Sequence, residues 1–257
     1  MIDLHSHLLP GVDDGSRTLA QSVAVLTRLA GEGVEAVCLT PHLLASDAIA
    51  GTPAGHDRVF EELRAAAPAG ISLYRGAEVM MDRPLDPRVG QDRVVTLNHT
   101  RYLLLEFPRL VTAHATEQAL IGVTGAGLVP LVAHPERYKC VNPTLAQRWK
   151  ELGAVLQVDG PTLISPRSRG ERARQLVAHG LADIAAADNH GDDRSLRPVQ
   201  DALVEMAGGQ QAELLLLANP RAILEDRPLE PVPPLVWRLS IVDRLRSLLD
   251  RSTQERT

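Results

Sequence analysis

Short apolar segments alternate with longer segments of helical period along most of this 257-residue chain. The apolar segments are rich in Val, Ile and Leu, which favours buried β-strands. Seven strands are predicted, at 2–5, 36–40, 71–75, 102–107, 129–133, 155–158 and 184–187. Helices are predicted at 18–32, 57–67, 116–125, 143–152, 169–179 and 196–207. This alternation indicates repeated βα units around a parallel sheet.

Glycine follows most of these helices and precedes the next strand, where a left-handed cap residue is favoured. Gly33, Gly70, Gly127, Gly153 and Gly180 occupy such positions. A sheet of this kind closes into a barrel, and barrel enzymes place their chemistry at the C-terminal ends of the strands. The predicted fold class is α/β, a distorted seven-stranded (β/α) TIM-like barrel with a C-terminal helical extension.

The pattern changes after residue 207. The run 213–217 predicts a last strand or a buried segment, with a short helix through Leu224. The Pro-rich stretch 228–234 predicts a linker to an amphipathic helix at 234–251, for which packing on the barrel is favoured over an oligomer contact. The expected domains are a barrel at 1–226 and an extension at 227–257.

Composition narrows the function classes. The chain is 44% hydrophobic, enough for a large core, and it has neither a secretory start nor an apolar run of roughly 20 residues. We therefore expect a cytoplasmic protein without membrane insertion. A net charge of −5 and 3% aromatic residues argue against nucleic acid as a partner. Neither Cys38 nor Cys140 has an arginine six positions later, which disfavours a cysteine phosphatase.

Imidazole and carboxylate side chains lie at or after the ends of six of the seven predicted strands. These residues are His5, His7, His42, Glu78, Glu106, His134, Asp188 and His190. Each alone has a structural alternative, such as a turn cap or an ion pair with arginine. Because the C-terminal ends of parallel strands meet at one edge, we expect the whole set to converge on metal ions. The remaining histidines, at 56, 99, 114 and 179, are expected at the surface.

At these positions the chain resembles the polymerase and histidinol phosphatase (PHP) superfamily, and within it the bacterial manganese-dependent tyrosine phosphatases of capsule and exopolysaccharide synthesis. The opening segment 3–15, Asp-Leu-His-Ser-His-Leu-Leu-Pro-Gly-Val-Asp-Asp-Gly, matches that branch in nearly every position. Further motifs follow in the same order: Thr40-Pro41-His42, Gly76-Ala77-Glu78, Leu104-Leu105-Glu106-Phe107-Pro108 and His134-Pro135-Glu136-Arg137-Tyr138. The resemblance covers roughly residues 1–225.

The resemblance implies a three-metal centre. One ion would be held by His5, His7, Glu78 and Asp188, a second by Asp14, His42 and His190, and a third by Glu78, Glu106 and His134. Asp13 is the neighbouring alternative to Asp14. Two or three divalent ions are expected, and the mixed imidazole and carboxylate donors suit manganese, iron or zinc, with manganese favoured by the resemblance.

The family usually ends its last motif Ser-Asp-x-His-Asn, whereas here the chain reads Ala187-Asp188-Asn189-His190-Gly191. Both ligands remain, but a hydroxyl and an amide are lost. Arg137 is expected to bind phosphate oxygens, with a salt bridge to Glu136 or Asp159 as its alternative role. The arginine expected after the last motif is either Arg194 or Arg197.

The implied reaction is hydrolysis of phosphotyrosine by a metal-activated hydroxide. The implied substrate is the tyrosine-rich tail of a bacterial kinase that controls polysaccharide export, and oligomerisation stays open. One alternative is a small-molecule phosphatase, for example on histidinol phosphate. Another is a non-catalytic metal-binding regulator that binds phosphorylated partners. A nuclease or polymerase-editing module is disfavoured by the acidic charge.

Overall fold

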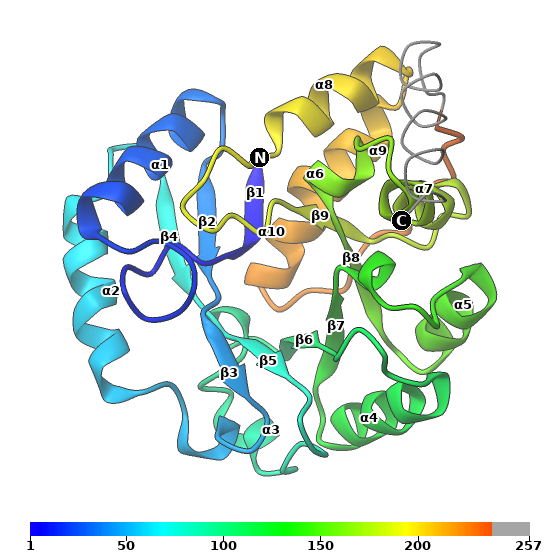
Figure 1. The fold of residues 1–257 in the computed structure, drawn as a ribbon, viewed down its shortest axis with the longest axis horizontal. Coiled ribbons are helices and arrows are strands. Elements are labelled where there is room, and N and C mark those ends of the chain that lie inside the picture. Colours follow the sequence, from blue (N-terminus) through cyan, green and yellow to red (C-terminus); the bar gives the residue numbers. More distant parts are fainter. Residues whose placement is uncertain (238–257) are drawn as a thin grey trace, which may run out of the picture.

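Parallel β-strands form the centre of the computed structural model, which describes residues 1–237 (Figure 1). A three-stranded sheet has the order β1 (Ile2–Ser6), β2 (Ala36–Leu39) and β4 (Ser72–Arg75). A six-stranded sheet has the order β3 (His42–Leu44), β5 (Glu78–Met80), β6 (Tyr102–Glu106), β7 (Val129–Ala133), β8 (Val155–Asp159) and β9 (Ile184–Ala186). The prediction of an α/β fold with parallel strands is confirmed.

Two short strands that were not predicted, β3 and β5, follow the ends of β2 and β4. Strands β2 and β4 pair as far as Leu39 with Arg75, and β3 and β5 resume with His42 opposite Glu78. Pro41 lacks the N–H that a regular ladder needs, and at Gly76 the backbone passes close to Leu97, where a Cβ would lie 2.7 Å from Cδ2. These two additional strands raise the strand count to nine among the described residues and carry the chain from the first sheet to the second.

The two sheets also approach each other at β9 and β1. Ser6 and Asn189 form an isolated parallel bridge, and the N–H of His7 donates to the carbonyl of Asn189 at 2.8 Å. This contact stops after one bridge because Asn189 lies beyond the end of β9. Within residues 1–237 the ladders therefore form two sheets, and a closed barrel is not observed.

Six longer helices lie outside the strands (Figure 1). They are α1 (Leu19–Gly31), α2 (Ala54–Ala66), α4 (Ala113–Gly125), α5 (Pro143–Glu151), α7 (Ser168–Ala178) and α8 (Arg197–Glu205), each within three residues of a predicted helix at both ends. The side chains of Thr18, Thr112 and Asn142 accept hydrogen bonds from backbone N–H groups in the first turns of α1, α4 and α5. These caps set the starts of the three helices.

The remaining helical elements are short. They are η1 (Ala48–Ala50), α3 (Val89–Asp92), η2 (Leu97–His99), η3 (Pro135–Arg137), α6 (Gly160–Leu163), α9 (Gly209–Glu213), η4 (Leu214–Ala218) and α10 (Asn219–Leu224). No helix in the described part of the chain is long and apolar enough to cross a membrane.

The last predicted strand, at 213–217, is wrong. These residues continue from α9 into the π-helical turn η4, where Leu214, Leu215 and Leu216 are buried. Four consecutive leucines have no alternation, so the sequence pattern cannot separate a buried helix from a strand. The alternative of a buried segment is confirmed, and the short helix ending at Leu224 is present as α10. Most of the predicted C-terminal helix lies outside the described residues.

The strands separate two apolar clusters. Leu103, Leu105 and Val132 belong to the larger cluster, which packs against the outer helices. Alternate residues such as Leu104 and Leu131 belong to a second cluster, which also contains Ile223 and Leu224 of α10. The second cluster includes residues at the starts of the strands, so α10 covers that end. The opposite end of the strands is left to polar side chains.

Candidate metal centre

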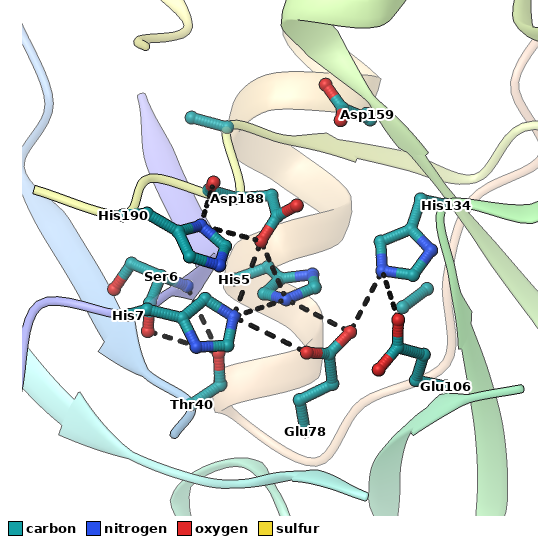
Figure 2. A network of polar contacts seen from close by, with 12 residues as sticks. His5, Ser6, His7, Thr40, Glu78, Glu106, His134, Asp159, Asp188 and His190 are labelled. Carbon is teal, nitrogen blue, oxygen red and sulfur yellow. Dashed lines mark hydrogen bonds and ion pairs between the residues drawn. The ribbon is translucent and has the colours of Figure 1, made fainter. Parts of the chain in front are cut away.

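All nine predicted ligands gather at the C-terminal ends of the strands. Figure 2 labels all of them except Asp14 and His42. They fall into four overlapping groups whose donor atoms lie within 4.8 Å of one another: His7, Asp14, His42 and His190; His5, Glu78 and His134; His5, His7 and Asp188; and His42, Glu78 and Glu106. His5, His7, Glu78, His134 and Asp188 are buried, whereas the side chains of Asp14 and His42 are 70% and 37% exposed. The centre is thus buried on one side and open on the other.

His5 and His7 share the inner face of β1 and its continuation, as their spacing predicts. Their Nε2 atoms lie 3.2 Å apart, and each also lies within 3.4 Å of an oxygen of Glu78 and of Asp188. Ser6 points the other way and donates to the carbonyl of Cys38. Two imidazole nitrogens and two carboxylates therefore converge on one point.

Neighbouring side chains orient both imidazoles. Nδ1 of His5 lies 2.9 Å from Oε1 of Gln157, and Nδ1 of His7 lies 2.8 Å from Oδ2 of Asp13. These acceptors favour a proton on each Nδ1 and leave the Nε2 lone pairs facing the cluster, as is typical of metal-binding histidines. Gln157 was not predicted as part of the site, because a neutral amide is not a typical metal ligand, although its inward position on β8 follows from strand alternation.

The neighbouring carboxylates Asp13 and Asp14 occupy different positions. Asp13 accepts hydrogen bonds from the N–H groups of Gly15 and His42 in addition to its contact with His7. Asp14 lies 3.3 Å from Nε2 of His42 and 3.6 Å from Nε2 of His190. Asp14 is therefore the one of the pair that faces the candidate ligands directly.

Glu78 lies at the middle of the cluster. One of its oxygens lies 2.9 Å from Nε2 of His134, and the other lies 3.0 Å from Nδ1 of His42. Glu106 is the next carboxylate along, with Oε1 3.7 Å from Nε2 of His134. Its buried Oε2 has no hydrogen-bond partner within residues 1–237, although a buried carboxylate oxygen is normally satisfied. A cation beside Glu106 would satisfy it.

Negative charge from carboxylates dominates the cluster of candidate ligands. Burial lowers the pKa of His5, but the carboxylates of Glu78 and Asp188 outweigh it and raise the pKa to about 9. Burial raises the pKa of Asp188, but His5, His7 and Arg137 hold it well below its usual range. Burial and the charge of Glu78 raise the pKa of Glu106 to about 7. The buried acids therefore attract protons or other cations.

The backbone reaches these positions through unusual conformations. His134 and Asp188 both have positive φ, 32° and 49°, directly after β7 and near the end of β9. Such conformations are rare for residues with a Cβ and are often found at functional sites. A Cβ on Gly15 would lie only 2.0 Å from the carbonyl oxygen of His7, so glycine is required where the loop with Asp13 and Asp14 passes over β1's continuation.

A pocket of about 430 Å³ opens over the cluster. Its lining includes Glu78, Asp188 and other candidate ligands, the apolar side chains Leu43, Leu44 and Met80, and two arginines, Arg109 and Arg137. Arg109 directly follows the motif that ends at Pro108 but was not among the predicted site residues. The pocket is thus lined by candidate metal ligands, by apolar side chains and by positively charged arginines.

The three arginines predicted to bind phosphate differ in position. Arg137 forms ion pairs with Asp159 at 2.8 Å and with Asp188. Arg194 lies 3.5 Å from Asp188 and pairs with Asp192 at 2.8 Å. Arg197 pairs with Asp201 on α8, and neither Arg194 nor Arg197 lines the pocket itself. The structure thus brings Arg137 and Arg194, but not Arg197, to the candidate centre.

The four remaining histidines lie away from the centre. His99, His114 and His179 are exposed, as predicted. His56 is half-buried and, with His99, lines a separate cavity of about 260 Å³ beside Phe60 and Arg75. None of the four belongs to a group of metal-competent side chains in the described part of the chain.

Comparison with known proteins agrees with this geometry. A family model described as "Capsular polysaccharide synthesis, CpsB/CapC" matches residues 1–225. The chain belongs to the CpsB/CapC family. The resemblance inferred from the sequence motifs is confirmed.

Named CpsB/CapC relatives match nearly the whole chain. The tyrosine-protein phosphatase CpsB of Streptococcus pneumoniae is 26% identical over 245 residues, covering 88% of this chain and 99% of the relative. The tyrosine-protein phosphatase YwqE of Bacillus subtilis is 27% identical over 243 residues, covering 91% and 95%. Crystal structures of YwqE and CpsB, described as metal-dependent tyrosine phosphatases, give a match with a TM-score of 0.72 and 25% identity over 93% of this chain and 100% of the other.

Proposed function

We propose that this chain is a metal-dependent protein-tyrosine phosphatase that dephosphorylates a bacterial tyrosine kinase controlling capsule or exopolysaccharide synthesis. The observation that carries the proposal is the convergence of nine imidazole and carboxylate side chains beneath a pocket with arginines at its rim. The names of the CpsB/CapC relatives support the choice of phosphotyrosine. The kinase as partner is inferred from the family resemblance.

The donor set fits divalent cations, because buried acids with depressed pKa values and oriented Nε2 atoms face one another. We assign His5, His7, Glu78 and Asp188 to one ion, Asp14, His42 and His190 to a second, and Glu78, Glu106 and His134 to a third. The donors favour manganese over softer metals. Such ions supply a water of lowered pKa and positive charge for the phosphoryl oxygens.

The residues of the chain bind and orient the substrate. Arg137, whose side chain is 21% exposed at the pocket, presents a forked guanidinium that suits two phosphoryl oxygens, and its ion pairs with Asp159 and Asp188 hold the side chain in place. Arg194 is favoured over Arg197 as the second phosphate-binding arginine because it faces Asp188. Leu43, Leu44 and Met80 offer an apolar wall for the phenyl ring. A phenol of pKa about 10 leaves readily, so a strong general acid is not required.

We also propose that residues 1–226 form the catalytic unit and that the two sheets together act as one distorted seven-stranded barrel. The register of β2 with β4 continues into that of β3 with β5, and the bridge from Ser6 to Asn189 joins the outer edges. The family match ends at residue 225, close to the proposed boundary.

Metal-stripped protein should be tested on a phosphotyrosine peptide and on histidinol phosphate, with manganese, zinc or chelator added back. We expect manganese-dependent release of phosphate from the peptide and no release by the His5→Ala variant. Circular dichroism of that variant controls for folding. Hydrolysis of histidinol phosphate alone would instead indicate a small-molecule phosphatase. Peptide binding without any hydrolysis would favour a non-catalytic metal-binding regulator of phosphorylated partners.

A further inference from the structure

Five basic side chains from three separate segments lie beside the candidate active site. They are Arg109 after β6, Lys139 after η3, and Arg167, Arg169 and Arg172 at the start of α7; we call them the basic cluster. The N–H of Lys139 donates to the carbonyl of Arg109 at 3.3 Å, and Nε of Arg172 donates to the carbonyl of Glu136 at 2.8 Å. These contacts join the three segments at η3, next to Arg137.

The basic cluster is continuous with the pocket. Arg109 and Arg137 line the same 430 Å³ pocket as Glu78 and Asp188. Partial burial and the positive charges of Arg109, Arg137 and Arg172 lower the pKa of Arg169, so these guanidinium groups lie near one another. Positive charge therefore extends from the pocket over its rim onto α7.

The side chains of the basic cluster form no ion pair with an acidic side chain in the described part of the chain. Within residues 1–237, Arg109, Lys139, Arg167 and Arg169 have no hydrogen bond or ion pair from their side chains, and Arg172 contacts only a backbone carbonyl. Most other exposed arginines are paired with acids, for example Arg58 with Glu62, Arg64 with Glu61, Arg148 with Glu151 and Arg197 with Asp201. Although the protein is acidic overall, its unpaired basic side chains are therefore concentrated in the basic cluster.

The stability of α7 does not explain this arrangement. The positive end of the helix dipole opposes arginines in the first turn, where acidic side chains are favoured. Glu171 in the same turn offsets one of the charges, but Arg169 and Arg172 flank it. Like charges brought together without partners repel one another, and an anionic ligand would relieve that repulsion.

We propose that the basic cluster is a subsite for a second anionic group of the substrate, so that the enzyme prefers phosphotyrosine within an acidic or multiply phosphorylated segment. The inference rests on the proposed phosphatase function. Carboxylates and a second phosphate share the chemistry that arginine recognises. Because the cluster is exposed, its effect acts through several weak charge contacts and is screened by salt.

Three matched phosphotyrosine peptides test the subsite: one with Ser and Ala flanks, one with Glu flanks, and one with a second phosphotyrosine. We expect kcat/KM to be about ten-fold higher for an anionic peptide than for the neutral one, since each exposed charge contact contributes a factor of a few. The double variant Arg167→Gln/Arg169→Gln should reduce that ratio to about two-fold or less. A preference for the Glu-flanked peptide would identify carboxylates as the second anionic group, and a preference for the doubly phosphorylated peptide would identify a second phosphate.

The matched control removes two exposed arginines of α2, as Arg58→Gln/Arg64→Gln, and should keep the wild-type ratio. A second readout is the fluorescence anisotropy of a labelled Glu-flanked peptide with Phe in place of phosphotyrosine, added to chelated protein. Its binding should weaken in the Arg167/Arg169 variant but not in the control, even if no peptide is hydrolysed. That separates failure of the subsite from failure of the phosphatase proposal.

Equal kcat/KM values for all three peptides in the wild-type protein would overturn the subsite. An unchanged ratio in the Arg167→Gln/Arg169→Gln variant would also overturn it. Binding of an acidic polysaccharide at the basic cluster, with no preference among the peptides, would reassign the surface to a different partner and overturn the proposal as stated.

Discussion

Asp13 lies 2.8 Å from Nδ1 of His7, and this contact turns Nε2 of the imidazole toward Glu78 and Asp188. The two residues are six positions apart, and the loop between them returns because the N–H of Ser16 donates to the carbonyl of His7 at 2.8 Å. Asp13 also accepts from the N–H of His42 at 3.3 Å. It therefore links two candidate ligands without facing the cluster itself.

Replacing Asp13 by Asn should weaken manganese binding without abolishing it. The amide keeps the shape but loses the charge that fixes the His7 tautomer, and such supporting contacts typically contribute about 10- to 100-fold in metal affinity. Titration of metal-stripped protein with manganese, followed by calorimetry, would measure the change. Asp14→Asn should instead remove one class of site. Identical binding curves for the two variants would contradict the separate roles.

Gly15→Ala should destabilise the fold by about 1–3 kcal/mol and misplace both Asp13 and Asp14. The new Cβ would lie 2.0 Å from the carbonyl oxygen of His7, and backbone atoms cannot move away cheaply. Urea unfolding measures the loss. Gly122→Ala in α4 is the control, since its Cβ would meet nothing within 4 Å and alanine favours a helix by roughly 0.5–1 kcal/mol. A stable, fully active Gly15→Ala protein would refute this role.

Much of the fold could be predicted because most of its strands and helices are marked by a local pattern of apolar and polar residues. The βα alternation located seven of the nine described strands and the six longer helices, since buried Val, Ile and Leu runs and helical periods are short-range signals. Strands β3 and β5 were missed, because each has only three residues and pairs with a partner that is distant in sequence. The leucines of η4 were ambiguous because a continuous apolar run carries no period.

The candidate site could be predicted as far as side-chain chemistry marked it. His5, Glu78 and Asp188 lie at strand ends, where parallel topology guarantees convergence. The choice between Asp13 and Asp14, and between Arg194 and Arg197, depended on loop geometry that no local pattern encodes. Gln157 and Arg109 were missed for a related reason: the residue type of a neutral amide or an exposed arginine does not indicate a role, and only the fold places them beside His5 and at the pocket.

Arg194→Gln should lower kcat/KM for a phosphotyrosine peptide about ten-fold or more, because a charged contact to the phosphoryl group is lost. Arg197→Gln should change kcat/KM less than two-fold, since its guanidinium pairs with Asp201 away from the pocket. Steady-state kinetics with saturating manganese distinguishes the two. A larger effect at Arg197 would reverse the choice between them.

Glu136→Gln should make stability less dependent on pH. Glu136 is fully buried, and burial and the charge of Asp159 raise its pKa to about 8. The folded state therefore holds a proton that the unfolded chain releases above its ordinary pKa of about 4.3. By linkage, this residue's contribution to stability declines as pH rises from about 4.5 to about 8, by at most about 1.4 kcal/mol per pH unit.

Glutamine mimics the protonated acid, and its Oε1 can still accept from the N–H of Asp159, which lies 3.0 Å from the Glu136 oxygen. The stability of the variant relative to wild type should therefore rise from pH 5 to pH 8. Urea unfolding of both chelated proteins at several pH values gives this difference, in which the titration of other groups largely cancels. Glu151→Gln, an exposed exchange beside Arg148, should show no such trend. A difference that stays constant with pH would mean that Glu136 is ionised in the folded protein.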